Sequence, residues 1–147
     1  MTKNISKRSF VRNIIVDTSP LVALFNKGDR HHDRCLRYFE AARDPFTTNI
    51  AVITEVSHLL KFSPLAARDC LTWIQKTFEI DNATPADLPR VFDIMAKYAD
   101  LPADFADASL VALCERTGIE HIATLDRDFD VYRLANGKPL VNVFASP

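Results

Sequence analysis

Hydrophobic positions along the chain fall into short runs and into stretches with a helical period. The run 13–18 is short, apolar and rich in β-branched residues, so it predicts a strand. Ser19 and Pro20 then offer a helix N-cap and a proline at the first helical position, and we expect a helix to about residue 26. Apolar residues recur at helical spacing over 33–43, which predicts a second helix.

The rest of the chain continues this alternation of helical and strand-like segments. We expect helices over 50–61, 64–77, 84–99 and 103–117, and strands in the segments PFTTN (45–49), FEID (78–81), HIATL (121–125) and PLVNVF (139–144). Strands that alternate with helices predict an α/β fold, with a mainly parallel sheet covered on both faces.

Polar residues mark where several of these helices begin. Asn49 and Ser63 are expected to act as N-caps, and Ser63 is followed by a proline. Thr84 opens a segment that resembles a capping box, with an acid, Asp87, three residues later.

The length and composition suit one domain. The chain has 147 residues, 48% of them hydrophobic, with three glycines and no segment typical of a linker. We expect a single domain over 13–147, preceded by a basic arm over 1–12. The arm has four basic side chains and no acid (Lys3, Lys7, Arg8, Arg12), whereas the whole chain has a net charge of −1. Such an arm could contact phosphates, although a solvated tail explains it as well.

Membrane and secretory classes do not fit the pattern. No apolar run approaches the roughly 18 to 20 residues of a membrane span, and the first residues lack the apolar core of a signal peptide. Cys35, Cys70 and Cys114 are odd in number and widely spaced among apolar neighbours, as reduced core thiols are. We therefore expect a cytoplasmic protein with no membrane contact, no disulfide and no zinc site.

Two acids directly follow predicted strands. Asp17 closes the first strand, and Asp126 follows HIATL in the same way. Sites in α/β sheets form beyond the carboxyl ends of the strands, so we expect the two carboxylates at one end of the sheet. A turn or capping role is the plainer explanation for either acid alone.

Two further acids lie on predicted helices. At about 100° per residue, Asp107 falls within the apolar stripe of helix 103–117. A carboxylate there is costly to bury unless a cation or hydrogen-bond donors replace its water. A cap at Asp104 with Asp107 in the first turn explains Asp104 well and Asp107 poorly. Glu55 lies at the border of the apolar face of helix 50–61, where it could equally reach solvent.

Together these acids favour a metal site. Asp17, Glu55, Asp107 and Asp126 would gather at one end of the sheet, and the pattern offers no compensating cation. Oxygen ligands without His or Cys select Mg²⁺ or Mn²⁺ rather than zinc. Carboxylate-held Mg²⁺ typically works on phosphates. We therefore interpret Asp17 as a metal ligand.

Four segments resemble those of the PIN-domain ribonucleases, and among them the VapC-like toxins of bacterial and archaeal toxin–antitoxin pairs. They are IIVDTSPLVALF, TTNIAVITEVSHLL, DFADASLVALCERTG and IATLDRDF, in the family's order and spacing. The resemblance covers residues 13–144. Each segment alone is weak evidence for the family, but four of them in the same order are a specific signature.

The resemblance implies a PIN-like three-layer α/β/α sandwich and a Mg²⁺- or Mn²⁺-dependent endoribonuclease, commonly a homodimer silenced by an antitoxin protein. Carried onto this sequence, it implies a catalytic quartet (Asp17, Glu55, Asp107, Asp126). The implied metal ligands are Asp17, Asp107 and Asp126, with Asp104 as a further candidate. Thr18, Ser19 and Thr124 match the hydroxyl positions near the metal.

Other classes fit less well. A phosphohydrolase of the haloacid-dehalogenase type needs a second acid two residues after Asp17, where this chain has Ser19. A phospho-accepting receiver domain needs a lysine at the end of a late strand, but Asp126 follows HIATL and the next lysine is Lys138. An RNA-processing or decay nuclease of the PIN family, and a PIN-like binding module that no longer cleaves, stay open.

Overall fold

A computed structural model describes residues 12–145, so all of the predicted arm except Arg12 lies outside the described residues. Its centre is a five-stranded sheet in the order β3-β2-β1-β4-β5, in which every pairing is parallel. The strands are β1 (Ile14–Val16), β2 (Phe46–Asn49), β3 (Glu79–Asp81), β4 (His121–Ala123) and β5 (Val141–Asn142). The predicted α/β class and parallel sheet are confirmed.

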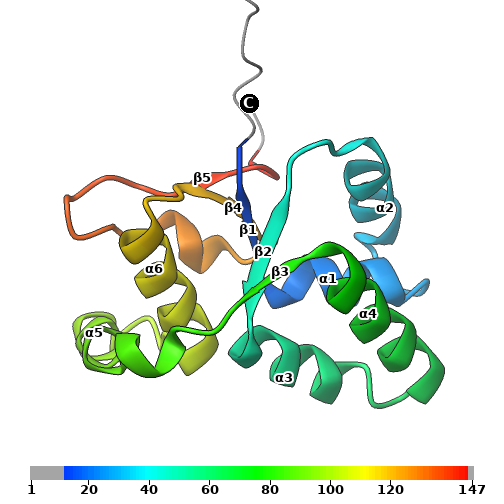
Figure 1. Cartoon of the computed structure of the whole chain (residues 1–147), viewed down its shortest axis with the longest axis horizontal. Coiled ribbons are helices and arrows are strands. Elements are labelled where there is room, and N and C mark those ends of the chain that lie inside the picture. The colour runs from blue at the N-terminus through cyan, green and yellow to red at the C-terminus, as the bar shows by residue number, and fades with distance from the viewer. Residues whose placement is uncertain (1–11, 146–147) are drawn as a thin grey trace, which may run out of the picture.

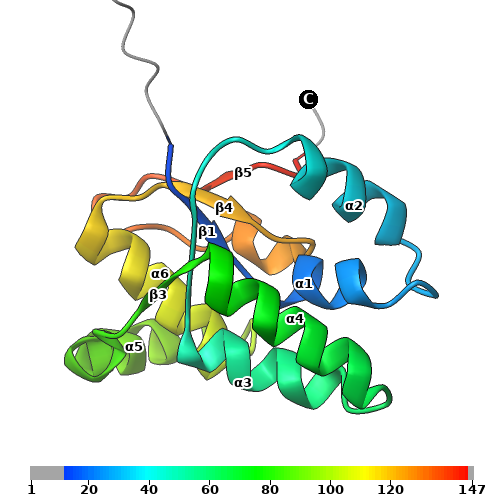
Figure 2. The ribbon, with the colours of Figure 1, turned by 45° about the vertical axis from the view of Figure 1, so that its right-hand side comes forward.

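Helices lie on both sides of the sheet (Figures 1 and 2). They are α1 (Thr18–Phe25), α2 (His32–Ala41), α3 (Ile50–Leu59), α4 (Pro64–Thr77), α5 (Thr84–Lys97) and α6 (Phe105–Thr117), with a short 3₁₀ helix η1 (Arg127–Asp130). In both views α5 and α6 pack together on one side, and α1, α2 and α4 lie on the other. This is the three-layer sandwich expected from the sequence.

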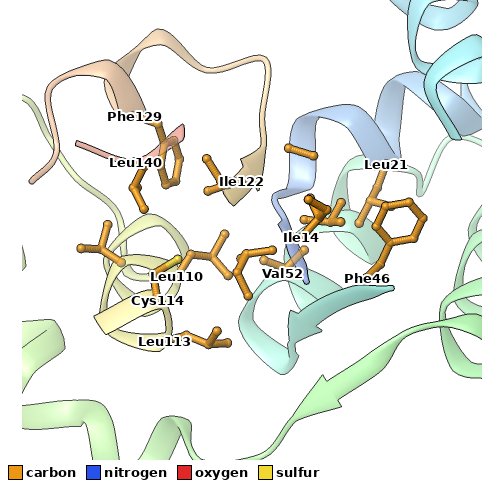
Figure 3. Close-up of a cluster of buried hydrophobic side chains, with 14 of the residues drawn as sticks. Ile14, Leu21, Phe46, Val52, Leu110, Leu113, Cys114, Ile122, Phe129 and Leu140 are labelled. Carbon is orange, nitrogen blue, oxygen red and sulfur yellow. The ribbon is translucent and has the colours of Figure 1, made fainter. Parts of the chain in front are cut away.

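Helix α6 is the inner helix of its layer. Its residues from Ala106 to Cys114 are all buried, because α5 covers it on one side and the sheet lies on the other. Figure 3 shows Leu110 and Cys114 of α6 in the same cluster as Ile14 of β1 and Ile122 of β4. All three cysteines are buried and free, as predicted.

Two predicted helix caps are wrong. The first helix begins at Thr18, and the hydroxyl of Ser19 does not cap it but accepts a hydrogen bond from the backbone N–H of Leu125. Helix α5 begins at Thr84 as predicted, but no side chain of the described residues caps it, and Asp87 forms an ion pair with Arg116 of α6. The caps predicted at Asn49 and Ser63 are confirmed by their bonds to the N–H groups of Val52 and Ala66.

The last strand is shorter than predicted. Only Val141 and Asn142 pair in β5, whereas the pattern indicated residues 139–144. Leu140 and Phe144 on either side are buried, so their apolar character reflects core packing rather than strand pairing. Within residues 12–145, no helix is long and apolar enough to cross a membrane.

The carboxyl ends of the strands define one end of the molecule. Since α1 directly follows β1 and α3 directly follows β2, both helices begin there. Helix α6 runs back toward the start of β4, so it too begins at this end. The N-termini of three helices therefore converge beside the ends of β1 and β4.

Candidate active site

The four predicted site acids all lie at this end of the sheet. Asp17 follows β1 and Asp126 follows β4, while Glu55 lies in α3 and Asp107 in the first turn of α6. Their charges interact: Asp17 is influenced by Glu55 and Asp126, and Asp107 by Asp17 and Asp126. The structure brings together side chains that are up to 109 residues apart in the sequence (126 − 17).

A hydroxyl links the two acids at the strand ends. The Thr124 hydroxyl donates to Asp17 Oδ2 at 2.7 Å and accepts from the backbone N–H of Asp126 at 3.0 Å. Thr124 is itself fixed by Asn142 of β5, whose Nδ2 donates to the Thr124 carbonyl at 3.0 Å. The Ser19 hydroxyl accepts a hydrogen bond from the backbone N–H of Leu125, the residue between Thr124 and Asp126. Thr124 and Ser19 therefore lie beside the strand-end acids, and their predicted role near a metal stays a prediction.

Asp107 is held from two directions. Its backbone N–H donates to Asp104 Oδ1 at 2.8 Å, which makes Asp104 the N-cap of α6. The hydroxyl of Tyr132 donates to Asp107 Oδ2 at 3.2 Å. Asp107 is only 7% exposed, whereas Asp104 is exposed. Helix capping thus explains Asp104. It does not explain why the carboxylate of Asp107 is buried.

Burial shifts the ionisation of these acids. It raises the pKa of Asp17 to about 7, and the Thr124 hydrogen bond offsets only part of the effect. Burial, followed by the charges of Asp17, Asp104 and Asp126, raises the pKa of Asp107 to about 8. The pKa of Glu55 is also raised, first by burial and then by Asp104. Near neutral pH the cluster therefore opposes its own ionisation.

Basic side chains do not relieve this repulsion. The ion pairs found within residues 12–145 join Arg68 to Asp69, Arg90 to Glu115, and Arg116 to both Asp81 and Asp87. None of them includes an acid of the cluster. A cation from solution is the remaining way to compensate buried, like-charged carboxylates when they ionise.

The donors fit a hard cation. All the side chains of the cluster offer oxygen, the ligand type that Mg²⁺ and Mn²⁺ prefer. The Thr18 hydroxyl oxygen is also buried here and, across the described residues, has no hydrogen-bond partner. It lies near enough to Glu55 to lower the pKa of that acid without forming a hydrogen bond of good geometry. A buried, unpartnered oxygen suits a water molecule or a hydrated ion.

The acids do not form a finished coordination shell. Over the range 12–145, no three Asp, Glu, His or Cys side chains are grouped closely enough to hold one ion. The hydrogen bonds to Thr124 and Tyr132 direct one oxygen of Asp17 and one of Asp107 toward protein donors. The second oxygen of each remains for an ion, but some of the acids must move closer together to share one.

A groove opens beside the cluster. It has a volume of about 830 Å³ and lies between α3, the segment that joins β3 to α5, and the start of α6. Glu55 and Asp104 line it, together with apolar side chains that include Ile50, Leu88 and Phe105. Of the four cluster acids, Glu55 is thus the one that faces the groove directly, beside Asp104.

Two residues of the site were not predicted. Tyr132 follows η1 and reaches Asp107, and Asn142 lies in the edge strand and holds Thr124. Asn142 gave a usable signal, since it is the polar residue within the apolar segment PLVNVF. Tyr132 gave none, because a tyrosine among apolar residues is typical of any core.

Comparisons with known proteins agree with this geometry. The chain is 26% identical over 118 residues to Ribonuclease VapC26 of Mycobacterium tuberculosis (strain ATCC 25618 / H37Rv), covering 78% of this chain and 87% of the relative. Its fold matches the crystal structure of Mycobacterium tuberculosis VapC20, described as a Sarcin-Ricin loop cleaving toxin, with a TM-score of 0.74. That match has 23% sequence identity and covers 80% of this chain and 93% of the other. Residues 14–134 match the PIN domain. The chain, whose acids gather where the parallel strands end, belongs to the PIN domain family.

Proposed function

We propose that this protein is a divalent-metal-dependent endoribonuclease that hydrolyses RNA phosphodiester bonds, and that a single domain over 13–147 carries the activity. The observation that supports it most is the pair of buried acids, Asp17 and Asp107, beside Glu55 and Asp126 without a basic partner among the described residues. Burying like-charged carboxylates lowers the free energy of unfolding, and a bound cation compensates this repulsion. Groups with such shifted pKa values are typical of functional sites.

The proposed ligands are Asp17, Asp107 and Asp126, with Asp104 as a further candidate. A bound Mg²⁺ or Mn²⁺ would supply positive charge for the phosphate oxygens and lower the pKa of a water molecule. Glu55 completes the catalytic quartet; it is half-buried and lines the groove, where it can accept a proton from an attacking water.

Hydroxyl groups support these roles. Thr124 fixes one oxygen of Asp17, which leaves the other to a ligand. Ser19 holds the backbone beside it, and Thr18 adds its unpartnered oxygen. Together they determine where the strand-end acids point.

The biological role we propose is that of the toxin in a toxin–antitoxin pair. Both relatives described above carry VapC names, one called a ribonuclease and the other a toxin that cleaves the Sarcin-Ricin loop. By analogy, the partners are an RNA substrate, a cognate antitoxin protein and a second copy of the chain in a homodimer, and the location is the cytoplasm.

The primary test is RNA cleavage by the purified protein with Mg²⁺, with Mn²⁺ and with EDTA. We expect cleavage with either metal and none in EDTA, with 5′-phosphate and 3′-hydroxyl ends on the products. Asp107→Asn should abolish cleavage. Asp93→Asn, which removes an exposed acid of α5, is the matched control and should cleave like the parent. Equal cleavage in EDTA and in Mg²⁺ would exclude the mechanism.

The toxin role has its own test. Inducing the gene alone should arrest growth and cut cellular RNA, and co-expression of the partner protein should restore growth. Asp107→Asn, induced to the same level, should not arrest growth. Normal growth with abundant folded, active protein would instead favour an RNA-processing role.

A further inference from the structure

Tyr132 is the largest side chain buried at the site that the proposed function does not use. It is 0% exposed, and its ring packs edge-on against Phe129 at 5.0 Å and against Tyr98 at 5.1 Å between ring centroids. Two such contacts fix the plane of the ring as well as its position. The hydroxyl at its tip therefore has little freedom to move.

The backbone around Tyr132 is fixed as well. The N–H of Arg133 donates to the Tyr98 hydroxyl at 2.9 Å, which ties this segment to the end of α5. The Arg133 guanidinium donates to the carbonyl oxygens of Asp130 at 2.7 Å and Tyr132 at 3.0 Å. These bonds close the turn after η1, so the main chain at Tyr132 is held in place as well as its ring.

The hydroxyl meets one oxygen of Asp107. It donates to Oδ2 at 3.2 Å, slightly longer than the roughly 2.5 to 3.0 Å of most O–H···O hydrogen bonds. Within the described part of the chain, Oδ1 of Asp107 has no hydrogen-bond partner. An ionised carboxylate only accepts hydrogen bonds, so a single donor on Oδ2 distinguishes the two oxygens.

We propose that Tyr132 is a positioning residue, which holds Asp107 by Oδ2 so that Oδ1 faces the metal. This rests on the proposed function, because it takes Asp107 as a ligand. Donors that hold the ligands of a metal set their orientation, and losing one typically weakens metal affinity by about 10- to 100-fold. A purely structural Tyr132, whose bond only satisfies a buried hydroxyl, would have no such effect.

Tyr132→Phe tests this directly, since it removes the hydroxyl and keeps the ring. The matched control is Tyr38→Phe, which removes a hydroxyl from α2, in the layer on the other side of the sheet, without touching Tyr132 or an acid of the cluster. Binding of Mn²⁺ is measured by electron paramagnetic resonance of the free ion, and thermal unfolding is measured in EDTA. We expect Tyr132→Phe to bind Mn²⁺ about tenfold or more weakly, and Tyr38→Phe to bind it within twofold of the parent.

The unfolding data separate positioning from folding. A loss of Mn²⁺ affinity in Tyr132→Phe with a melting temperature in EDTA close to that of Tyr38→Phe supports the proposal. Mn²⁺ affinity within twofold of the parent overturns it, as does an equal loss in both variants. If the parent itself neither binds Mn²⁺ nor cuts RNA, the proposed function fails first, which is a distinct result.

A crystal structure of the parent with Mn²⁺ gives a measurement that does not depend on the folding of any variant. It should show Asp107 bonded to the Tyr132 hydroxyl through Oδ2 and to the ion through Oδ1. An ion on Oδ2, with the tyrosine hydroxyl displaced from Asp107, would overturn the proposal.

Discussion

Replacing Asp107 by Asn should stabilise the metal-free protein. The pKa of Asp107 is raised from 3.8 to about 8, mainly by burial, so folding at pH 7 forces a proton onto this group or desolvates its charge. About three pKa units separate 3.8 from pH 7, which sets an upper limit of about 4 kcal/mol on this cost. Asparagine has nearly the same shape and no ionisable group, so it avoids this free-energy cost. Burying its amide group costs some stability as well, but less. We expect a net gain of about 1 to 2 kcal/mol.

The pH dependence of this gain identifies its cause. A carboxyl group whose pKa is raised by folding binds its proton more tightly in the folded state, so it favours folding below pH 4 and loses that contribution as pH rises toward 8. The Asp107→Asn protein has no carboxyl group at this position, so its stability does not fall in this way as pH rises. Its stability relative to the parent should therefore grow by about 1 kcal/mol per pH unit between pH 5 and pH 7.

Urea unfolding in EDTA at pH 5, 6 and 7 measures both quantities, with Asp93→Asn as the control for removal of an exposed acid. We expect the control to follow the parent at every pH. An Asp107→Asn protein that is about 0.5 to 2 kcal/mol less stable than the parent, equally at each pH, would refute the reasoning, because that is how loss of a helix cap or ion pair behaves.

Three further outcomes are expected. Mg²⁺ should raise the melting temperature of the parent more at pH 8 than at pH 6, because protons compete for Asp17 and Asp107, and equal shifts would contradict this. Thr124→Val should lower cleavage at limiting Mg²⁺ by about 10- to 100-fold, since it removes the donor to Asp17, and saturating Mg²⁺ should restore part of the rate. Asn49→Ala should cost about 1 to 3 kcal/mol in urea unfolding, because Asn49 caps α3 and donates to Ser109 across the core; a change below 0.5 kcal/mol would show that these bonds contribute little.

The sequence predicted the acids of the site better than the contacts that hold them. Asp17 and Asp126 could be placed because strand ends in a parallel sheet share an edge, and Asp107 because a carboxylate stood out within an apolar stripe. The capping role of Ser19 was predicted wrongly, because its hydroxyl accepts a hydrogen bond from Leu125, which is distant in the sequence, and not from its own helix. Tyr132 reaches Asp107 across 25 residues, a contact that depends on how the segment after η1 packs in the folded protein.

The position of β1 in the middle of the sheet has a consequence for synthesis of the protein. One edge of β1 pairs with β2, which is synthesised early. Its other edge pairs with β4, which is synthesised about a hundred residues later. Until β4 docks, Asp17 lacks Thr124, and the nascent chain has no Asp126 to set beside it. An enzyme that cuts RNA would thus be made in a form unable to do so, and would become active only after nearly the whole domain had left the ribosome.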